Sequence, residues 1–425
     1  MRRSLARPVF SSAVVVLSAA VGIGVSWAQR RDAFVAPRDH PAIGYSTAPV
    51  NDPVSRLNRR VAAGEVSLAF DAANGYLGAV LAALNVPVES QTLVFSPTSL
   101  QSDRISMHNP RAVFFNDTVA VGWVRGGDIL EVTALDPKQG VVFYSLDQKP
   151  DGRPVFTRDD RCLACHLSWD TLGVPGLMLM SMFPLPDDPN AYANGFTTVQ
   201  GSPLEQRWGG WWVTGDHGGV AHMGNVPVMA PDARHKIAAP TAPRESVKGL
   251  FDLKGYPTPY SDVVAQLVLA HQVRMTNMLT RAGWEARLAA AEPSADATAR
   301  VREAAAELVD YMLFVDEAPL AKPVRGTSGF AERFAGQGPR DAQGRSLREL
   351  DLRRRLFKYP CSYMIYSEAF DALPPMAKDA VYARLQVVLL GKDAAPRYKV
   401  LSAADRRAVL DILRATKEGL PQGLR

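Results

Sequence analysis

The chain is short of cysteine, with three in 425 residues, and it is only slightly unbalanced in charge. Three cysteines are too few for a framework of disulfide bonds to stabilise an exported fold. A composition that is 47% apolar and 21% charged is ordinary for a globular protein. It excludes a disordered chain, a collagen-like repeat and a multi-span membrane protein, and it supplies enough apolar material for one large core or two.

The formal net charge of +5 comes mainly from the first 28 residues. These contain Arg2, Arg3 and Arg7 and no acidic residue, so residues 29–425 carry 45 basic and 43 acidic side chains. A nucleic-acid-binding surface would need basic residues gathered in a run or on one face. The charge pattern therefore predicts no nucleic-acid partner.

Residues 1–28 have the three parts of a secretory signal peptide. A positively charged start over 1–8 is followed by an apolar stretch over 9–25 and by Ser26-Trp27-Ala28, a small-x-small cleavage pattern. The apolar stretch is shorter than the roughly 20 residues of a membrane-spanning helix. We therefore expect export to the periplasm, with membrane attachment only through this leader if it is not cleaved.

Beyond the leader, the residue patterns predict an α+β fold. Residues 29–52 mix Pro, Asp, Arg and Ser without a period and should form a flexible lead-in. Residues 53–260 should be a β-rich region whose later part, over 147–260, is irregular and rich in loops. Residues 261–425 should be mainly helical.

The individual elements follow from periodicity and turn residues. β-branched and aromatic runs predict an antiparallel meander over 112–115, 118–124, 129–134 and 141–146. Apolar residues at helical spacing predict helices over 54–63, 76–84, 262–291, 294–314, 374–390 and 403–417, the last behind a Ser402 cap. The segment 322–345, rich in Gly, Arg and Gln, should be an exposed connector.

The segment 161–166 contains Cys162, Cys165 and His166 in the pattern C-x-x-C-H, the attachment signature of c-type haem. Two thiols three residues apart can reach the two vinyl groups of one haem and form thioethers. The adjacent histidine then becomes the proximal iron ligand. A disulfide, a buried thiol pair and a thioredoxin-like redox pair are the alternatives. The redox pair would need a preceding strand and a helix that opens at the first cysteine, whereas the flanking residues indicate loops.

The motif resembles that of c-type cytochromes, and a wider stretch over about 90–390 is similar to a group of large exported single-haem proteins of unassigned activity. The wider likeness is carried by RWGGWWVTG at 207–215, HMGN at 222–225 and YPCSY at 359–363. The resemblance implies one covalent haem c, with Cys162 and Cys165 as thioether residues. Because more than about 130 mature residues precede the motif, the whole chain is not a small cytochrome fold.

A second axial ligand to the iron is usual in electron-transfer haems. Met223 is the first candidate, because it lies 57 residues after His166 in a Gly-rich loop. His222 and His217 lie in the same region, and His271 lies on the apolar side of a predicted helix. For His271 we favour a hydrogen-bonded core residue, and an open coordination site is the remaining alternative.

Other chemistry-bearing residues have structural interpretations. Met178, Met180 and Met182 alternate as they would in a buried strand. Cys361 lies among Tyr, Met and Ile and should be a buried, inert thiol. The tryptophans at 208, 211 and 212 could wall a haem, but ordinary packing around glycine turns is favoured.

Three functions fit these patterns. The first is a periplasmic electron-transfer cytochrome that docks redox partner proteins. The second is a haem-dependent oxidoreductase or peroxidase-like enzyme, in which Asp216 and His217 would be the acid–base pair to consider first. The third is a haem sensor or an accessory of a respiratory complex. We favour the first function.

Overall fold

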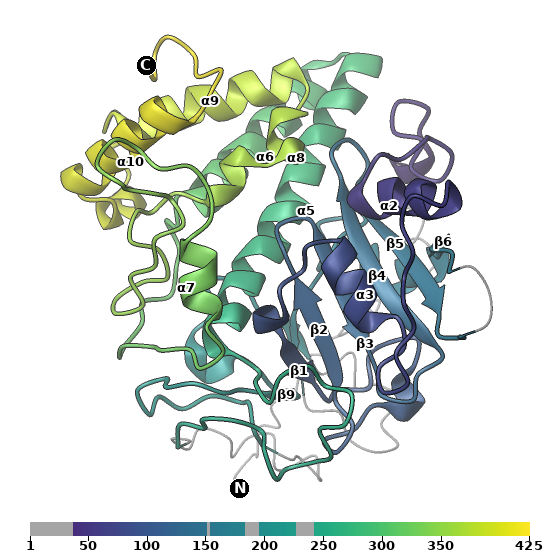
Figure 1. Ribbon diagram of the computed structural model, residues 1–425. Coiled ribbons are helices and arrows are strands. Elements are labelled where there is room, and N and C mark those ends of the chain that lie inside the picture. Colours follow the sequence, from purple (N-terminus) through teal and green to yellow (C-terminus); the bar gives the residue numbers. More distant parts are fainter. Residues whose placement is uncertain (1–36, 151–153, 183–194, 227–241) are drawn as a thin grey trace, which may run out of the picture.

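The computed structural model describes residues 37–150, 154–182, 195–226 and 242–425. The signal peptide predicted over 1–28 lies outside the described residues. The fold is α+β, as expected, with an antiparallel sheet that precedes a mainly helical C-terminal region (Figure 1).

The main sheet has the strand order β6-β5-β4-β3-β2-β1-β9, and every neighbouring pair is antiparallel. Its strands are β1 (Thr92–Val94), β2 (Arg111–Phe115), β3 (Val119–Trp123), β4 (Ile129–Asp136), β5 (Gly140–Asp147), β6 (Thr157–Arg158) and β9 (Trp211–Trp212). A second, two-stranded sheet pairs β7 (Met180–Ser181) with β8 (Phe196–Thr197). The predicted meander is thus confirmed as β2 to β5.

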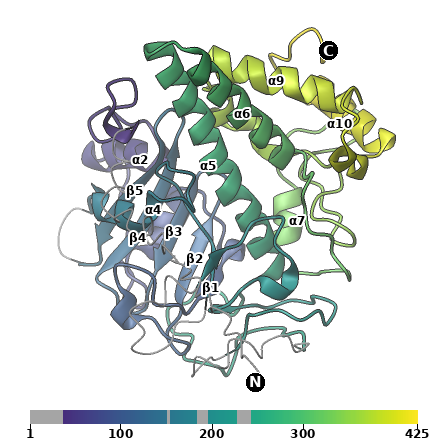
Figure 2. The same cartoon turned by 180° about the vertical axis from the view of Figure 1, so that it is seen from behind.

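The two faces of the sheet pack against different helices. On one face, Phe114, Val121, Leu130 and Val142 are buried with residues of α2 (Pro53–Ala62) and α3 (Leu77–Ala83). The opposite face is crossed by α5 (Val263–Ala291), and the two views in Figures 1 and 2 agree on this arrangement. Successive side chains along each strand point to opposite faces of the sheet. The order of apolar residues within each strand therefore determines which of them pack against each helical layer.

The helical region begins with α5 and continues with α6 (Ala295–Met312), α7 (Phe330–Ala335), α8 (Glu368–Asp371), α9 (Pro375–Leu389) and α10 (Ala403–Thr416). Polar caps set several helix starts. Asp262 Oδ1 accepts hydrogen bonds from the amides of Val264 and Ala265, and Ser402 forms the capping box of α10. The side chains of α5, α6 and α9 share one core with residues of the sheet, so the transition near 260 is a change of secondary structure within one packed unit.

Two expectations about loops were wrong in part. The lead-in is packed over 37–52, because Ile43 and Tyr45 are buried and the Tyr45 hydroxyl donates to the Val141 carbonyl at 2.7 Å. The expected connector over 322–345 contains α7, whose Phe330 and Phe334 are buried in the main core. In both segments a few aromatic side chains outweigh a polar composition, since each buries a large apolar area.

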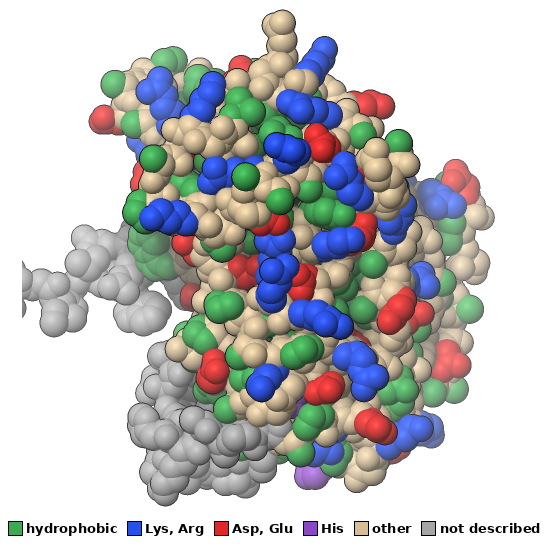
Figure 3. Space-filling model, turned by 90° about the vertical axis from the view of Figure 1, so that its left-hand side faces the viewer, with side chains coloured by type: hydrophobic (Ala, Val, Ile, Leu, Met, Phe, Trp, Pro, Cys, Tyr) green, Lys and Arg blue, Asp and Glu red, His purple; other side chains and the backbone are tan. Residues whose placement is uncertain are grey.

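On the molecular face shown in Figure 3, basic and acidic side chains are interspersed. Arg281–Glu307 and Arg397–Asp316 are two of the ion pairs in the molecule. Among the described helices, none combines the length and the apolar character needed to cross a membrane.

Candidate cofactor-binding site

A cavity of about 400 Å³ lies between the sheet, α5 and the segment that carries the cysteine motif. Ala120 and Gly122 of β3 form part of its wall, where larger side chains would fill the space. Leu269 and Val273 of α5 supply another side of the wall. The remaining lining residues come from 94–100, from strands β2, β4 and β5, from 161–166, from 177–180 and from Trp211. The volume is within the range of natural small-molecule and cofactor sites, about 300–1,000 Å³.

All three residues of the motif line this cavity. Cys162 ends a short 3-10 turn and His166 ends the following short helix, α4 (Leu163–His166). The Asp159 side chain caps this turn by accepting from the Arg161 amide at 3.2 Å. Cys162 is half-buried and Cys165 is exposed, and both are free thiols. Burial raises the pKa of Cys162 to about 12, so its thiol is neutral in the absence of a bound group.

The imidazole of His166 is fixed by its backbone surroundings. Its Nδ1 lies 2.8 Å from the Gly176 carbonyl oxygen, which can only accept, so Nδ1 carries the proton and donates. The tautomer so selected leaves Nε2 with a free lone pair, the arrangement found in metal-ligating histidines. The Phe143 ring lies 4.9 Å from the imidazole, measured between ring centroids.

The Gly176 carbonyl is held in place by helix α5. Asn277 is buried, and its amide group accepts from Leu177 N at 3.0 Å and donates to Leu177 O at 2.7 Å. A Cβ atom on Gly176 would stand 2.3 Å from Asn277 Oδ1, so only glycine fits there. The helix thus positions the loop that orients His166, and sequence reasoning did not identify this role of Asn277.

The structure brings Met178 and Met180, rather than Met223, to the cavity. Met180 is half-buried, its sulfur accepts from Thr197 Oγ1 at 3.4 Å, and its carbonyl accepts from Trp211 Nε1 at 2.8 Å. The sulfur of Met223 instead lies 3.6 Å from Ser181 Oγ, and Met223 is not among the lining residues.

The 57-residue separation from His166 that favoured Met223 is typical of a small cytochrome, and in this chain Met223 lies outside the described lining of the cavity, so its assignment as an axial ligand stays a prediction. The core-strand interpretation of the three alternating methionines holds for Met182, which is buried, and fails for Met178 and Met180. The packing interpretation of the tryptophans holds for Trp208 and Trp212, whereas Trp211 lines the cavity.

One ion pair lies in the cavity wall. Arg111 of β2 donates to Glu131 Oε2 of β4 at 2.7 Å, across Gly122 of the strand between them. Both side chains are largely buried, and neither Arg111 Nε nor Glu131 Oε1 has a hydrogen-bond partner within the described parts of the chain. Unpartnered buried polar atoms are rare in native proteins and call for a ligand or a water.

The histidines of the Gly-rich segment do not line the cavity. His217 and His222 are buried against each other at 4.5 Å between ring centroids, and Trp208 packs on His222 at 5.2 Å. Burial lowers the pKa of both histidines, to about 3 for His222. Asp216 Oδ1 accepts from the Gly218 amide, and neither ring nitrogen of His217 has a hydrogen-bond partner among the described residues. Among the described residues no hydrogen bond joins the side chains of Asp216 and His217, so the structure does not show this candidate pair as a hydrogen-bonded dyad.

His271 and Cys361 are core residues, as predicted. Both ring nitrogens of the fully buried His271 are hydrogen-bonded, one to Gln200 Oε1 at 2.7 Å and the other to Ser362 Oγ at 2.8 Å. Cys361 is fully buried, and burial raises the pKa of its thiol to about 12. Neither side chain can reach a ligand without disrupting the core.

Within the described ranges, no three His, Cys, Asp or Glu side chains converge in a way that could hold a metal ion directly. The motif residues therefore face a shared cavity and do not form a chelating set of their own. In comparisons with known protein families, with curated proteins and with solved structures, the chain shows no significant similarity.

Proposed function

We propose that this protein is an exported, periplasmic c-type cytochrome that binds one covalent haem and transfers electrons. The observation that carries the proposal is the placement of Cys162, Cys165 and His166 on one cavity of about 400 Å³. The cavity offers two free thiols and a neutral imidazole with an available Nε2. The small residues Ala120 and Gly122 leave room along one wall, which suits a flat, covalently attached macrocycle. These residues therefore fit the cofactor that the motif implies.

Each motif residue has a distinct role in this proposal. The sulfurs of Cys162 and Cys165 would form the two thioether bonds, and His166 Nε2 would be the proximal ligand while Gly176 holds its Nδ1 proton. For the distal side we favour the thioether sulfur of Met180, which lines the cavity, over that of Met223. Thr197 would restrict the Met180 sulfur through their 3.4 Å contact.

Electron transfer is favoured because a histidine–methionine pair raises the reduction potential and leaves no coordination position open for a substrate. The bound group would supply the one-electron chemistry. The chain holds it, excludes water with Leu269 and Val273, and leaves Cys165 exposed at the surface, where a redox partner protein can approach.

A haem-dependent oxidoreductase or peroxidase-like enzyme is the second candidate, and the Arg111–Glu131 pair is the observation that favours it. A buried carboxylate with one free oxygen can hold or move a proton, and a guanidinium can stabilise developing negative charge. This pair replaces Asp216 and His217 as the acid–base candidate.

Ligand binding separates the two functions. Haem-loaded protein should show a ferric methionine-to-iron charge-transfer band and should respond slowly or not at all to CO, cyanide and peroxide. Met180→Ala should abolish the band and permit rapid binding, whereas Met223→Ala should retain it. Rapid binding of these ligands by the wild-type protein would overturn the electron-transfer assignment and support the enzyme. Loss of the band in Met223→Ala alone would overturn the assignment of Met180.

A further inference from the structure

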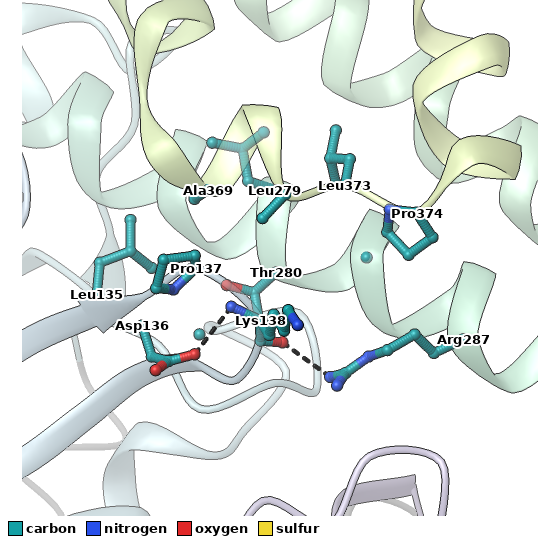
Figure 4. A pocket seen from close by; sticks show the side chains of 13 residues that line it. Leu135, Asp136, Pro137, Lys138, Leu279, Thr280, Arg287, Ala369, Leu373 and Pro374 are labelled. Atoms are coloured by element: carbon teal, nitrogen blue, oxygen red, sulfur yellow. Dashed lines mark hydrogen bonds between the residues drawn. The ribbon is translucent and has the colours of Figure 1, made fainter. Parts of the chain in front are cut away.

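A second cavity, of about 190 Å³, lies where the β4–β5 hairpin meets α5 and the segment that joins α8 to α9 (Figure 4). It shares no lining residue with the cavity that the cysteine motif faces. An engineered apolar cavity of about 150 Å³ binds benzene, so a space of this size can hold a small ring with one substituent.

The wall of the second cavity is partly apolar, with Leu135, Leu279, Leu373 and Pro374 around it. Gly283 also lines it, in the middle of the 29-residue helix α5. Glycine in a helix interior costs about 1 kcal/mol relative to alanine. A Cβ atom at this position would meet nothing closer than Leu373 Cδ2 at 3.7 Å. No close contact therefore requires glycine at position 283. The absence of a side chain there leaves part of the cavity open.

Arg287 supplies a positive charge at this cavity. Its NH2 group donates to the Lys138 carbonyl at 2.8 Å, which fixes the guanidinium between the hairpin and α5, as Figure 4 shows. Across the described residues, no carboxylate lies within ion-pair distance of Arg287. Asp136 faces the same cavity, but its oxygens accept from the amides of Asn51, Lys138 and Gln139. Burial lowers the pKa of Arg287, and the negative charge of Asp136 opposes part of this shift.

We propose that this cavity binds a small monocarboxylate with a compact apolar body, about the size of benzoate. The carboxylate would accept hydrogen bonds from the guanidinium donors of Arg287 that do not bond Lys138 O, in the geometry that arginine offers to carboxylates. The apolar body would pack between Leu279 and Leu373, over the space left by Gly283. The site is independent of the proposed haem, because its residues do not touch the other cavity.

The test is calorimetric titration of the full-length haem-loaded protein with benzoate and with benzyl alcohol, its neutral analogue. Benzoate should bind with a dissociation constant on the order of 0.1 mM, and benzyl alcohol at least tenfold more weakly. Arg287→Met should weaken benzoate binding at least tenfold. The matched control Arg281→Met, on the same helix but paired with Glu307 outside the cavity, should leave it unchanged.

Two substitutions at Gly283 distinguish a loss of binding caused by filling the cavity from a loss caused by misfolding. Gly283→Ala should raise the melting temperature and still bind benzoate, whereas Gly283→Leu should fill the cavity and weaken binding at least tenfold in a folded protein. Equal affinity for benzyl alcohol, undiminished binding by Arg287→Met or by Gly283→Leu, or a benzoate dissociation constant weaker than about 10 mM would overturn the proposal.

Discussion

Replacing Asn277 with leucine should loosen the loop that orients His166 while preserving the branched side-chain shape. Asn277 forms two hydrogen bonds to the backbone of Leu177, at 3.0 and 2.7 Å, and its side chain is buried. A net contribution of about 1 kcal/mol per hydrogen bond, with a further penalty for leaving two backbone groups without partners, predicts a loss of about 2–4 kcal/mol in unfolding free energy.

The assay is urea denaturation of haem-loaded protein, followed by measurement of the midpoint potential and the visible spectrum. Asn277→Leu should lower the unfolding free energy and shift the potential, because the Gly176 carbonyl that fixes His166 becomes less constrained. Thr280→Val is the matched control on the same helix, since it removes only a bond to the Thr276 carbonyl. If Asn277→Leu unfolds like the wild type and keeps its potential, the positioning role of Asn277 is refuted.

Two further predictions concern buried groups away from the motif. Burial raises the pKa of Glu317 from 4.5 to about 7, so only the unfolded chain releases this proton between those values, and the contribution of Glu317 to the unfolding free energy should fall as pH rises from 4.5 to about 7. The buried histidines His217, His222 and His271, whose pKa values are lowered, contribute with the opposite sign below about 6.5. Glu317→Gln should remove this negative contribution, so that the unfolding free energy changes more positively with pH across that range than it does in the wild type, and an unchanged slope would contradict the assignment. Cys361 is fully buried, so native haem-loaded protein should react with no equivalent of a thiol reagent. After denaturation it should react with one equivalent, and three equivalents would mean that Cys162 and Cys165 carry no haem.

Most helices and the meander could be predicted from the sequence because their signals are local. The predicted start of α5 at Asp262 agrees with the structure. Asp262 caps the first turn, and the apolar periodicity begins directly after it, so both signals are local in the sequence. Local signals fail where a distant partner decides the structure. Tyr45 packs against Trp284, and its hydroxyl donates a hydrogen bond to the carbonyl of Val141, 96 residues later. Polar composition around it therefore gave the wrong expectation of a flexible lead-in.

Of the candidate site, only the cysteine–histidine motif could be located from the sequence. Cys162, Cys165 and His166 follow from spacing, but alternation alone cannot show that Met180 faces a cavity while Met182 faces the core. One signal was available and missed. Ala120 and Gly122, two small residues at successive inward positions of a predicted strand, indicate a space on that face.

The central claim is that the exported chain carries one covalent haem. It is tested most directly by expressing the full-length protein with the haem-maturation machinery and measuring the intact mass under denaturing conditions, alongside a gel stained for haem. The account predicts a mature chain cleaved near Ala28, heavier by one haem, with the staining lost in a Cys162→Ala, Cys165→Ala double variant. A stably folded mature protein of unmodified mass would contradict it.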